Sequence, residues 1–426
     1  MPTAPPPAQQ SPQAPAESAD VVGMTIESAR AEPHPSRVTV AVVMTSWATD
    51  WGERRAAIRM VAGALALSAD IVVVSLDDRS DPSRLPPRRT FDGIFPIHSA
   101  SARVPQRRLG QVLRSALERR PSSSSPASPS VPEAAARKLL ATDGQPSSEA
   151  LGILDHLKPD VVVLAGVETL WMAEAMPVGP SRPRIVVLPL LGTDSVLASD
   201  AMKPLAEIAD AVGAFSDTEY RLLSRSVGSR RPDVIHHLRL SFPVNRQAAH
   251  SGLAGVASFG RYLLVISGWP ELTDSAVGPP HDYLRAVLGD ISVAEVRPGQ
   301  WLVTESGRRF DVPWSSTQMN VWRLMAGAVA TLDVRPQGPI GREAIESLLF
   351  GTPVVVPAGS IAAEHAKASN GGLWYGSPGE MIEQVRYFLD DDSAREGFGR
   401  AGREWAEREH NDTQRLVDEL TRIVLG

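Results

Sequence analysis

Short apolar runs alternate with amphipathic segments along most of the chain. From residue 37 to 240 the apolar runs are rich in valine and isoleucine, and stretches with helical spacing separate most of them. The predicted strands cover residues 37–47, 70–76, 92–100, 160–166, 184–190, 211–217 and 233–240, and a helix is predicted from Glu53 to about Ser68. Strands that alternate with helices are typical of a parallel sheet covered on both faces.

The alternation is interrupted between residues 243 and 260 and then starts again. The second series predicts strands at 262–268, 292–297, 301–306, 329–334 and 352–357, and helices at 318–328, 341–351, 378–389, 393–409 and 413–424. Two separate series predict an α/β chain with two doubly wound, Rossmann-like domains. A (β/α)8 barrel is the alternative, but it needs one even series of eight units, which the interruption breaks.

Composition suggests where the domains begin and end. Residues 1–36 are rich in Pro, Ala, Ser and Gln, so they bury too little apolar surface to offset the entropy of ordering, and we expect a disordered tail. We expect a first domain over 37–245 with a flexible insert at about 121–133, and a second domain over 246–410. Residues 411–426 are predicted to form a terminal helix, for which a return to the first domain is one arrangement.

The composition also excludes several classes of function. The formal net charge is -6, which gives no electrostatic reason to expect nucleic acid as a partner. The absence of cysteine excludes disulfides, Cys-ligated zinc and thiol nucleophiles. There is neither a secretory signal pattern nor an apolar run of about 20 residues, so we expect a soluble cytoplasmic protein.

The most informative stretch is VATLDVRPQGPIGREAIESLLFGTPVVVP, residues 329–357, followed by a Glu-His region and Gly-Gly-Leu within 359–410. This stretch resembles the donor-site segment of the family 4 (group 1) glycosyltransferases. The match extends over roughly 260–425 and is most specific between 340 and 390. The resemblance implies a GT-B fold, in which two Rossmann-like domains face a central cleft. The C-terminal domain would hold the nucleotide sugar, and the N-terminal domain would hold the acceptor.

The same stretch suits phosphate binding for physical reasons. A strand that ends in a Gly-containing loop and opens a helix presents backbone N–H groups and the positive end of a helix dipole to an anion. A carboxylate on the following helix can accept two hydrogen bonds from vicinal hydroxyls, and the resemblance assigns Glu346 to the ribose. The expected donor-binding residues are Gly338, Ile340, Gly341, Arg342 and Glu346.

The chain departs from the family pattern where the family places charged groups. Gly338 stands where the family has a glutamate that contacts the donor sugar, and Trp269 stands where it has an arginine. Loss of a nucleoside diphosphate needs preplaced cations or N–H donors. Candidate replacements for the missing cations are Arg335, Arg342, Arg54 and Arg55. Further candidate donor or phosphate contacts are Gly52, Gly268, Trp269 and His365.

Each candidate also has a structural interpretation. Glu346 is alternatively a solvated helix glutamate, Arg342 a surface arginine, and His365 a buried or exposed histidine without a ligand. Trp47 and Trp51 flank the loop after the first strand and suit sugar stacking, although core packing is favoured. The arginine-rich segment 103–120 suits peripheral contact with an anionic membrane, but a helix of the first domain with solvated arginines is the preferred interpretation.

Taken together, these features predict an enzyme that moves a sugar from a nucleoside diphosphate sugar to an unknown acceptor. The resemblance implies retention of the anomeric configuration, no metal and no cofactor beyond the nucleotide sugar itself. No catalytic residue is assigned. The departures at Gly338 and Trp269 motivate an alternative, a catalytically degenerate GT-B protein that binds a nucleotide or a partner. A nucleotide-sugar epimerase is a third hypothesis.

Overall fold

A computed structural model describes the two predicted regions of strand–helix alternation. The described residues are 37–45, 53–77, 89–91, 95–101, 148–170, 172–173, 176, 182–191, 202, 205–251, 261–266, 284, 287–289, 291–296, 302–305, 308–311, 314–335 and 338–426. The predicted tail 1–36, the insert 121–133 and the arginine-rich segment 103–120 lie outside them.

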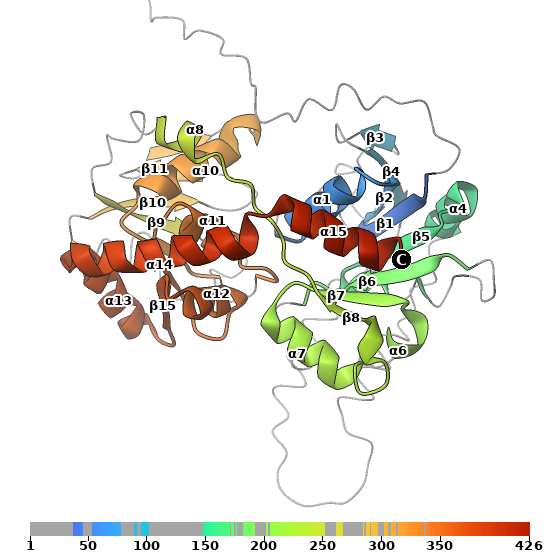
Figure 1. The fold of residues 1–426 in the computed structure, drawn as a ribbon. Helices are drawn as coiled ribbons and strands as arrows, with labels where there is room; N and C mark the ends of the chain where they lie inside the picture. Colours follow the sequence, from blue (N-terminus) through green and yellow to red (C-terminus); the bar gives the residue numbers. More distant parts are fainter. Residues whose placement is uncertain are drawn as a thin grey trace, which may run out of the picture. The chain divides into compact units, whose positions relative to one another are not determined.

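The first region forms an eight-stranded sheet with the order β3-β4-β2-β1-β5-β6-β7-β8 (Figure 1). Seven of these strands pair in parallel, and β3 pairs antiparallel with β4 at the edge. The strands are β1 (Thr39–Thr45), β2 (Asp70–Asp77), β3 (Arg89–Phe91), β4 (Pro96–Ser101), β5 (Val161–Ala165), β6 (Arg184–Leu188), β7 (Ala211–Ala214) and β8 (Ile235–His237). The central strands β1 and β5 are buried on both faces, which explains their nearly continuous apolar sequence.

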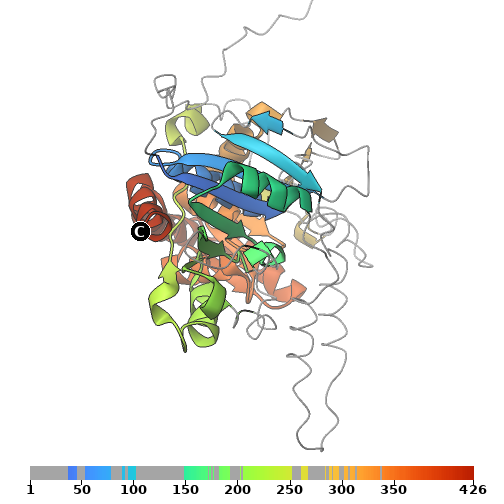
Figure 2. The same ribbon diagram turned by 90° about the vertical axis from the view of Figure 1, so that its right-hand side faces the viewer.

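Helices cover this sheet, and Figure 2 shows α4 across one of its faces, where it packs on β2 and β4. The helices of this region are α1 (Glu53–Leu65), α4 (Ser148–Leu157), α6 (Leu205–Ile208) and α7 (Asp217–Ser226), with short 3-10 turns at Val167–Thr169 and Pro232–Val234. The strand predicted at 211–217 ends at Ala214. It ends there because the Ser216 side chain accepts a hydrogen bond from the Glu219 N–H and caps α7.

The second region forms a seven-stranded sheet with the order β12-β11-β10-β9-β13-β14-β15. Its strands are β9 (Tyr262–Ile266), β10 (Ser292–Val296), β11 (Leu302–Glu305), β12 (Arg308–Asp311), β13 (Thr331–Asp333), β14 (Val354–Pro357) and β15 (Gly372–Tyr375). The helices are α8 (Arg246–Ser251), α10 (Trp314–Gly327), α11 (Arg342–Leu349), α12 (Ile361–Ser369), α13 (Pro378–Asp390) and α14 (Asp392–His410). Five strands pair in parallel, as the alternation predicts.

One edge of the second sheet differs from the predicted parallel arrangement. Strand β11 pairs antiparallel with both β10 and β12. Only positions 306 and 307 separate β11 from β12. A connection this short allows a hairpin but not the crossover of a dozen or more residues that parallel neighbours need.

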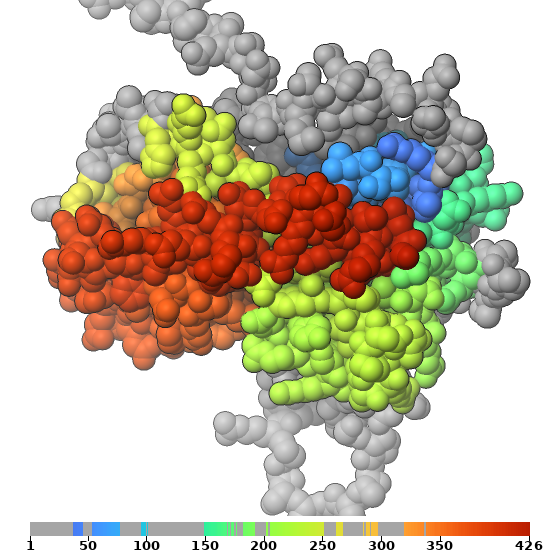
Figure 3. Space-filling model, viewed as in Figure 1, coloured from blue at the N-terminus to red at the C-terminus, as the bar shows by residue number. Residues whose placement is uncertain are grey.

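The chain ends with a helix that packs on the first sheet region. Helix α15 (Thr413–Val424) contacts α1 and β6, and Nη2 of Arg184 donates to the carbonyl of Ile423 at 3.1 Å. Its buried residues Leu416, Leu420 and Ile423 follow helical spacing and join a core cluster with residues of β1, α1 and α11. Figure 3 shows α15 on the surface beside α1, in continuation of α14.

Candidate functional site

The site predicted from the sequence lies at the start of α11. Strand β13 ends at Asp333, and Gly341 precedes the helix with φ 66° and ψ 38°, in the left-handed region. A Cβ atom at this position would lie 3.0 Å from both N and Cα of Ala362 in α12. Glycine is therefore needed at 341 for two reasons, the positive φ and the close approach of a second backbone.

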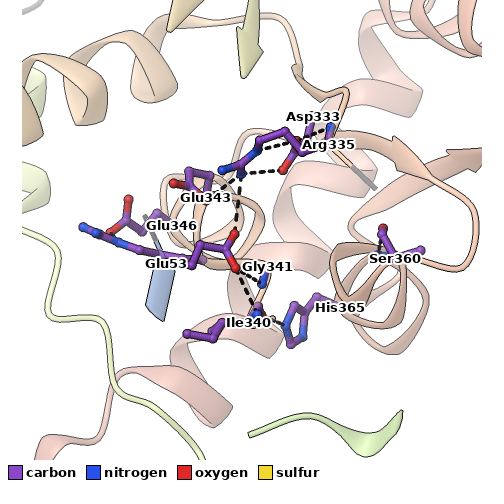
Figure 4. A network of polar contacts seen from close by, with 11 residues as sticks. Glu53, Asp333, Arg335, Ile340, Gly341, Glu343, Glu346, Ser360 and His365 are labelled. Carbon is purple, nitrogen blue, oxygen red and sulfur yellow. Dashed lines mark hydrogen bonds and ion pairs between the residues drawn. The ribbon is translucent and has the colours of Figure 1, made fainter. Parts of the chain in front are cut away.

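A carboxyl group from the other sheet region accepts hydrogen bonds from the N–H groups at this helix start. Oε2 of Glu53, the first residue of α1, accepts hydrogen bonds from the N–H of Ile340 at 2.9 Å and of Gly341 at 3.1 Å (Figure 4). The Glu53 residue is only 6% exposed. The local sequence does not distinguish Glu53 from other helix-start acids. Its only local signal is an acid in a first helical turn, which is common because it suits the helix dipole.

Arg335 connects three buried carboxyl groups next to these N–H groups. Its guanidinium donates to Asp333 through Nε at 2.9 Å and through Nη2 at 2.7 Å. Nη2 also donates to Oε2 of Glu343 at 2.7 Å and lies 3.5 Å from Oε1 of Glu53. The sequence suggests Arg335 as a replacement cation for phosphate, but in the structure its guanidinium is shared among three acids.

The cluster therefore holds more carboxyl groups than cations, which favours a proton on one of them below about pH 8. Burial raises the pKa of Glu53 to about 8, and the neighbouring Glu343 carboxylate adds to the rise. Burial acts in the same direction on Glu343, but the adjacent Arg335 guanidinium outweighs it and holds the pKa of Glu343 below its usual value. Because Glu343 has the shorter contact with Arg335, the proton belongs on Glu53.

Glu346 lies one turn further along α11 and is almost fully buried, with 2% of its surface exposed. Nε of Arg342 donates to its Oε1 at 2.8 Å, and the Arg342 side chain is 22% exposed. Burial raises the pKa of Glu346, and the charge of Arg342 opposes the rise. Glu346 is therefore not a solvated helix glutamate, and Arg342 is its partner within the same helix.

His365 in α12 holds the loop before α11 from the other side. Its Nε2 lies 2.7 Å from the carbonyl oxygen of Ile340, so Nε2 carries the hydrogen and donates to it. The ring also lies 5.5 Å from that of His410, which has Nδ1 2.9 Å from the carbonyl oxygen of Leu240. Both histidines are buried, and burial lowers the pKa of His365 to about 4 and of His410 to about 3.

Replacing His410 by asparagine should remove a source of acid sensitivity. Because the pKa of His410 is lowered on folding, the unfolded chain binds more protons between pH 6.5 and about 3, and stability falls as the pH falls through this range. We expect the wild type to lose up to about 1.4 kcal/mol per pH unit relative to His410→Asn. Urea unfolding at pH 7 and 5 measures the difference, with the exposed His250→Asn as control; parallel pH curves for the wild type and His410→Asn would contradict it.

The other candidates from the sequence lie in α1 or outside the described residues. Arg54 in α1 lies near Glu219 in α7. Burial raises the pKa of Glu219 to about 7, and the Arg54 charge opposes part of this rise. Gly52, Gly268, Trp269, Trp47 and Trp51 lie outside the described residues. Among the described helices, none has the length and apolar content that crossing a lipid bilayer requires.

Comparison with solved structures yields the same fold. Sucrose-phosphate synthase from Thermosynechococcus elongatus is 15% identical, with a TM-score of 0.57 over 91% of this chain and 98% of that chain. The trehalose-phosphate synthase (UDP-forming) from Burkholderia vietnamiensis is 12% identical, with a TM-score of 0.59 over 91% and 99%. Anabaena HepE in complex with UDP-glucose is 12% identical, with a TM-score of 0.55 over 90% and 98%.

Sequence comparison finds a family match for the part of the chain that carries the site. No curated protein sequence matches the chain. The model of a family described as "Glycosyl transferase-like" matches residues 301–421, which include α11, α12 and α14. Two Rossmann-like sheet regions together with this match confirm the resemblance found in the sequence. Residues 301–421 thus belong to a glycosyl transferase-like family, within a chain that has the GT-B fold of the group 1, family 4-like glycosyltransferases.

Proposed function

We propose that the chain transfers a sugar from a nucleoside diphosphate sugar to an acceptor, and that the start of α11 holds the donor. The observation that carries the proposal is the arrangement of Ile340, Gly341, Arg342 and Glu346 inside the segment that matches the glycosyl transferase-like family. A similar fold in HepE was solved with UDP-glucose, which supports a nucleotide sugar as the ligand class.

The proposed roles follow from the geometry at α11. The N–H groups of Ile340 and Gly341 both donate to one carboxyl oxygen here, and two such donors at a helix start are suited to an anionic oxygen of a donor. Glu346, kept next to the Arg342 charge, would accept hydrogen bonds from the ribose hydroxyls. His365 would position the loop through the Ile340 carbonyl rather than touch the donor.

The division of labour between the two regions is also a proposal. Residues 246–410 would bind the donor and residues 37–245 the acceptor, with retention of the anomeric configuration, as in the family that the sequence resembles. Catalysis would depend on excluding water from the donor, because hydrolysis competes with transfer. The Gly52, Gly268 and Trp269 positions would complete the phosphate contacts.

A second function has one specific observation in its favour. The Ile340 and Gly341 N–H groups are already occupied by Glu53, and Gly338 provides no carboxylate of its own. A GT-B protein that has lost catalysis and binds a nucleotide or a partner would need neither a free phosphate position nor a donor-sugar contact.

Calorimetric titration with UDP, GDP and ADP tests the donor site. We expect one nucleotide to bind the wild-type chain, and Glu346→Ala to weaken that binding by about 1–3 kcal/mol because a charged hydrogen bond to the ribose is lost. Glu396→Ala, a change of an exposed glutamate in α14, is the matched control and should leave the affinity unchanged.

Two outcomes would contradict the assignment. Unchanged affinity in Glu346→Ala would place the ribose elsewhere. Absence of binding by all three nucleotides would favour the degenerate, partner-binding alternative. Incubation with a panel of nucleotide sugars then distinguishes an active glycosyltransferase from a protein that only binds the nucleotide. Donor hydrolysis or transfer above a buffer blank is expected only of the enzyme.

A further inference from the structure

The carboxyl group of Glu53 occupies the position that a donor anion would need. We propose that Glu53 is an internal competitor at the start of α11, and that a nucleoside diphosphate binds only when it displaces this side chain. The inference rests on the proposed function, because it concerns the same N–H groups. It adds a residue of α1 that controls donor affinity without being part of the donor site itself.

The hydrogen bonds make the competition direct. Oε2 of Glu53 accepts from two consecutive N–H groups, those of Ile340 and Gly341, at 2.9 and 3.1 Å. Each N–H has one hydrogen and a fixed direction, since the positive φ of Gly341 and the His365 contact hold the loop in place. The same two N–H groups cannot bind both the carboxylate and a ligand oxygen with good geometry.

The close packing of Glu53 against Gly338 also indicates that Glu53 fills the volume beside the loop. A Cβ atom at this position would lie 2.7 and 2.8 Å from the two carboxylate oxygens of Glu53. The Glu53 side chain therefore fills the volume next to the loop that a side chain at 338 would otherwise enter. A Gly338→Glu substitution would collide with Glu53 unless that side chain moved, so it cannot test donor binding by itself.

Charge also opposes simultaneous occupancy. Glu53 faces Glu343 of α11 and Arg335, which is shared with Asp333 at the end of β13, while Arg342 of α11 lies close enough to sense its charge. A diphosphate added here would meet repulsion from Asp333 and Glu343 in a poorly solvated environment. Once Glu53 has left, the two N–H groups face the ligand and one acid fewer competes for Arg335.

Displacement has a proton signature. Glu53 is buried with a pKa of about 8, and in water its pKa would return to its ordinary value of 4.5. Between pH 4.5 and about 8, ligand binding therefore releases up to one proton from Glu53. The affinity then rises with pH by up to tenfold per unit and levels off above pH 8, because the association constant increases where the complex holds fewer protons.

A second contact of the same kind offers a matched control. Oε2 of Glu364 in α12 accepts a hydrogen bond from the N–H of Thr218, in the first turn of α7, at 3.3 Å. Like Glu53, Glu364 places a carboxylate at the start of a helix that belongs to the other sheet region. Its carboxylate contacts α7 and not the N–H groups of Ile340 and Gly341, so its removal tests the loss of such a contact without freeing those N–H groups.

The experiment is calorimetric titration of UDP, GDP and ADP into wild type, Glu53→Ala, Glu53→Gln and Glu364→Ala. Each titration is run at pH 6, 7 and 8 in two buffers of different ionisation enthalpy. At pH 7 we expect Glu53→Ala to bind one nucleotide at least about tenfold more tightly than wild type and Glu364→Ala. Wild type and Glu364→Ala should release close to one proton per nucleotide at pH 6 and 7 and about half a proton at pH 8, and both Glu53 variants should release none. Circular dichroism checks that each variant is folded. Glu53→Gln keeps the size and shape of the glutamate side chain, so it supplies the proton readout if Glu53→Ala does not fold.

The outcomes separate the inference from the proposed function. Equal affinity and equal proton release in wild type and both Glu53 variants would overturn the competition, while nucleotide binding itself would stand. Weaker binding in Glu53→Ala would also overturn it and would make Glu53 a donor contact. If no variant binds any nucleotide, the donor site itself is wrong, and the inference falls with it.

Discussion

Replacing Arg335 by alanine is expected to lower the free energy of unfolding by about 3–5 kcal/mol at pH 8. The guanidinium is the cation in direct contact with Asp333 and Glu343, and it lies 3.5 Å from Glu53. Asp333 and Glu343 are buried, so removing the cation leaves their two charges without compensation in a region that water does not reach. The loss should be smaller at pH 5, where the remaining carboxyl groups take up protons instead.

Chemical denaturation at both pH values measures this effect. Arg403→Ala is the control, because it breaks an exposed ion pair with Glu407 in α14 and should change stability by less than about 1 kcal/mol. Arg335→Lys should be intermediate, since a single ammonium group cannot bridge two carboxylates as the planar guanidinium does. A loss below 1 kcal/mol in Arg335→Ala, or one that does not depend on pH, would mean that the acids are solvated or paired by other groups.

Gly399→Ala is expected to destabilise the chain by about 3 kcal/mol or more. A Cβ atom on this residue of α14 would lie 2.1 Å from the carbonyl oxygen of Gly351, in the turn after α11. Neither atom belongs to a side chain that is free to rotate away, so α14 would have to shift from α11 and α12, which it covers. Because α11 carries the candidate site, nucleotide affinity should fall in the same variant.

Gly397, two residues earlier in the same helix, provides the matched control. A Cβ atom there meets nothing within 4 Å, so Gly397→Ala should gain about 0.5–1 kcal/mol from its higher helix propensity. Thermal and urea unfolding of the two variants should therefore move in opposite directions. Equal effects of both substitutions would show that α14 and the turn at Gly351 are not in close contact.

Much of the fold could be predicted from the periodicity of apolar residues. The central strands and the helices around residues 53, 342 and 413 begin within a few residues of their predicted positions, because local burial leaves a local pattern. Strand direction at a sheet edge leaves no such pattern. Apolar alternation describes β11 equally well as a parallel or an antiparallel strand, and only the short connection to β12 distinguishes them.

The candidate site was predictable in part for the same reason. Gly341 and Glu346 belong to one continuous segment, so their spacing and the resemblance locate them on one loop and helix. The contact of Glu53 with Ile340 joins residues 287 positions apart. No local feature of an acid at a helix start indicates that its side chain will accept hydrogen bonds from the N–H groups of a different helix.

By itself, the sequence determined the α/β class, the two sheet regions and the position of the glycine-containing loop before α11. These properties follow from short-range periodicity, from glycine positions and from motif spacing. Only the tertiary structure decided that Arg335 is enclosed by acids, that Glu53 occupies the loop N–H groups and that its pKa rises to about 8. Those properties depend on which distant groups are brought together and on how much water is excluded when they meet, and neither is encoded in any one segment of the chain.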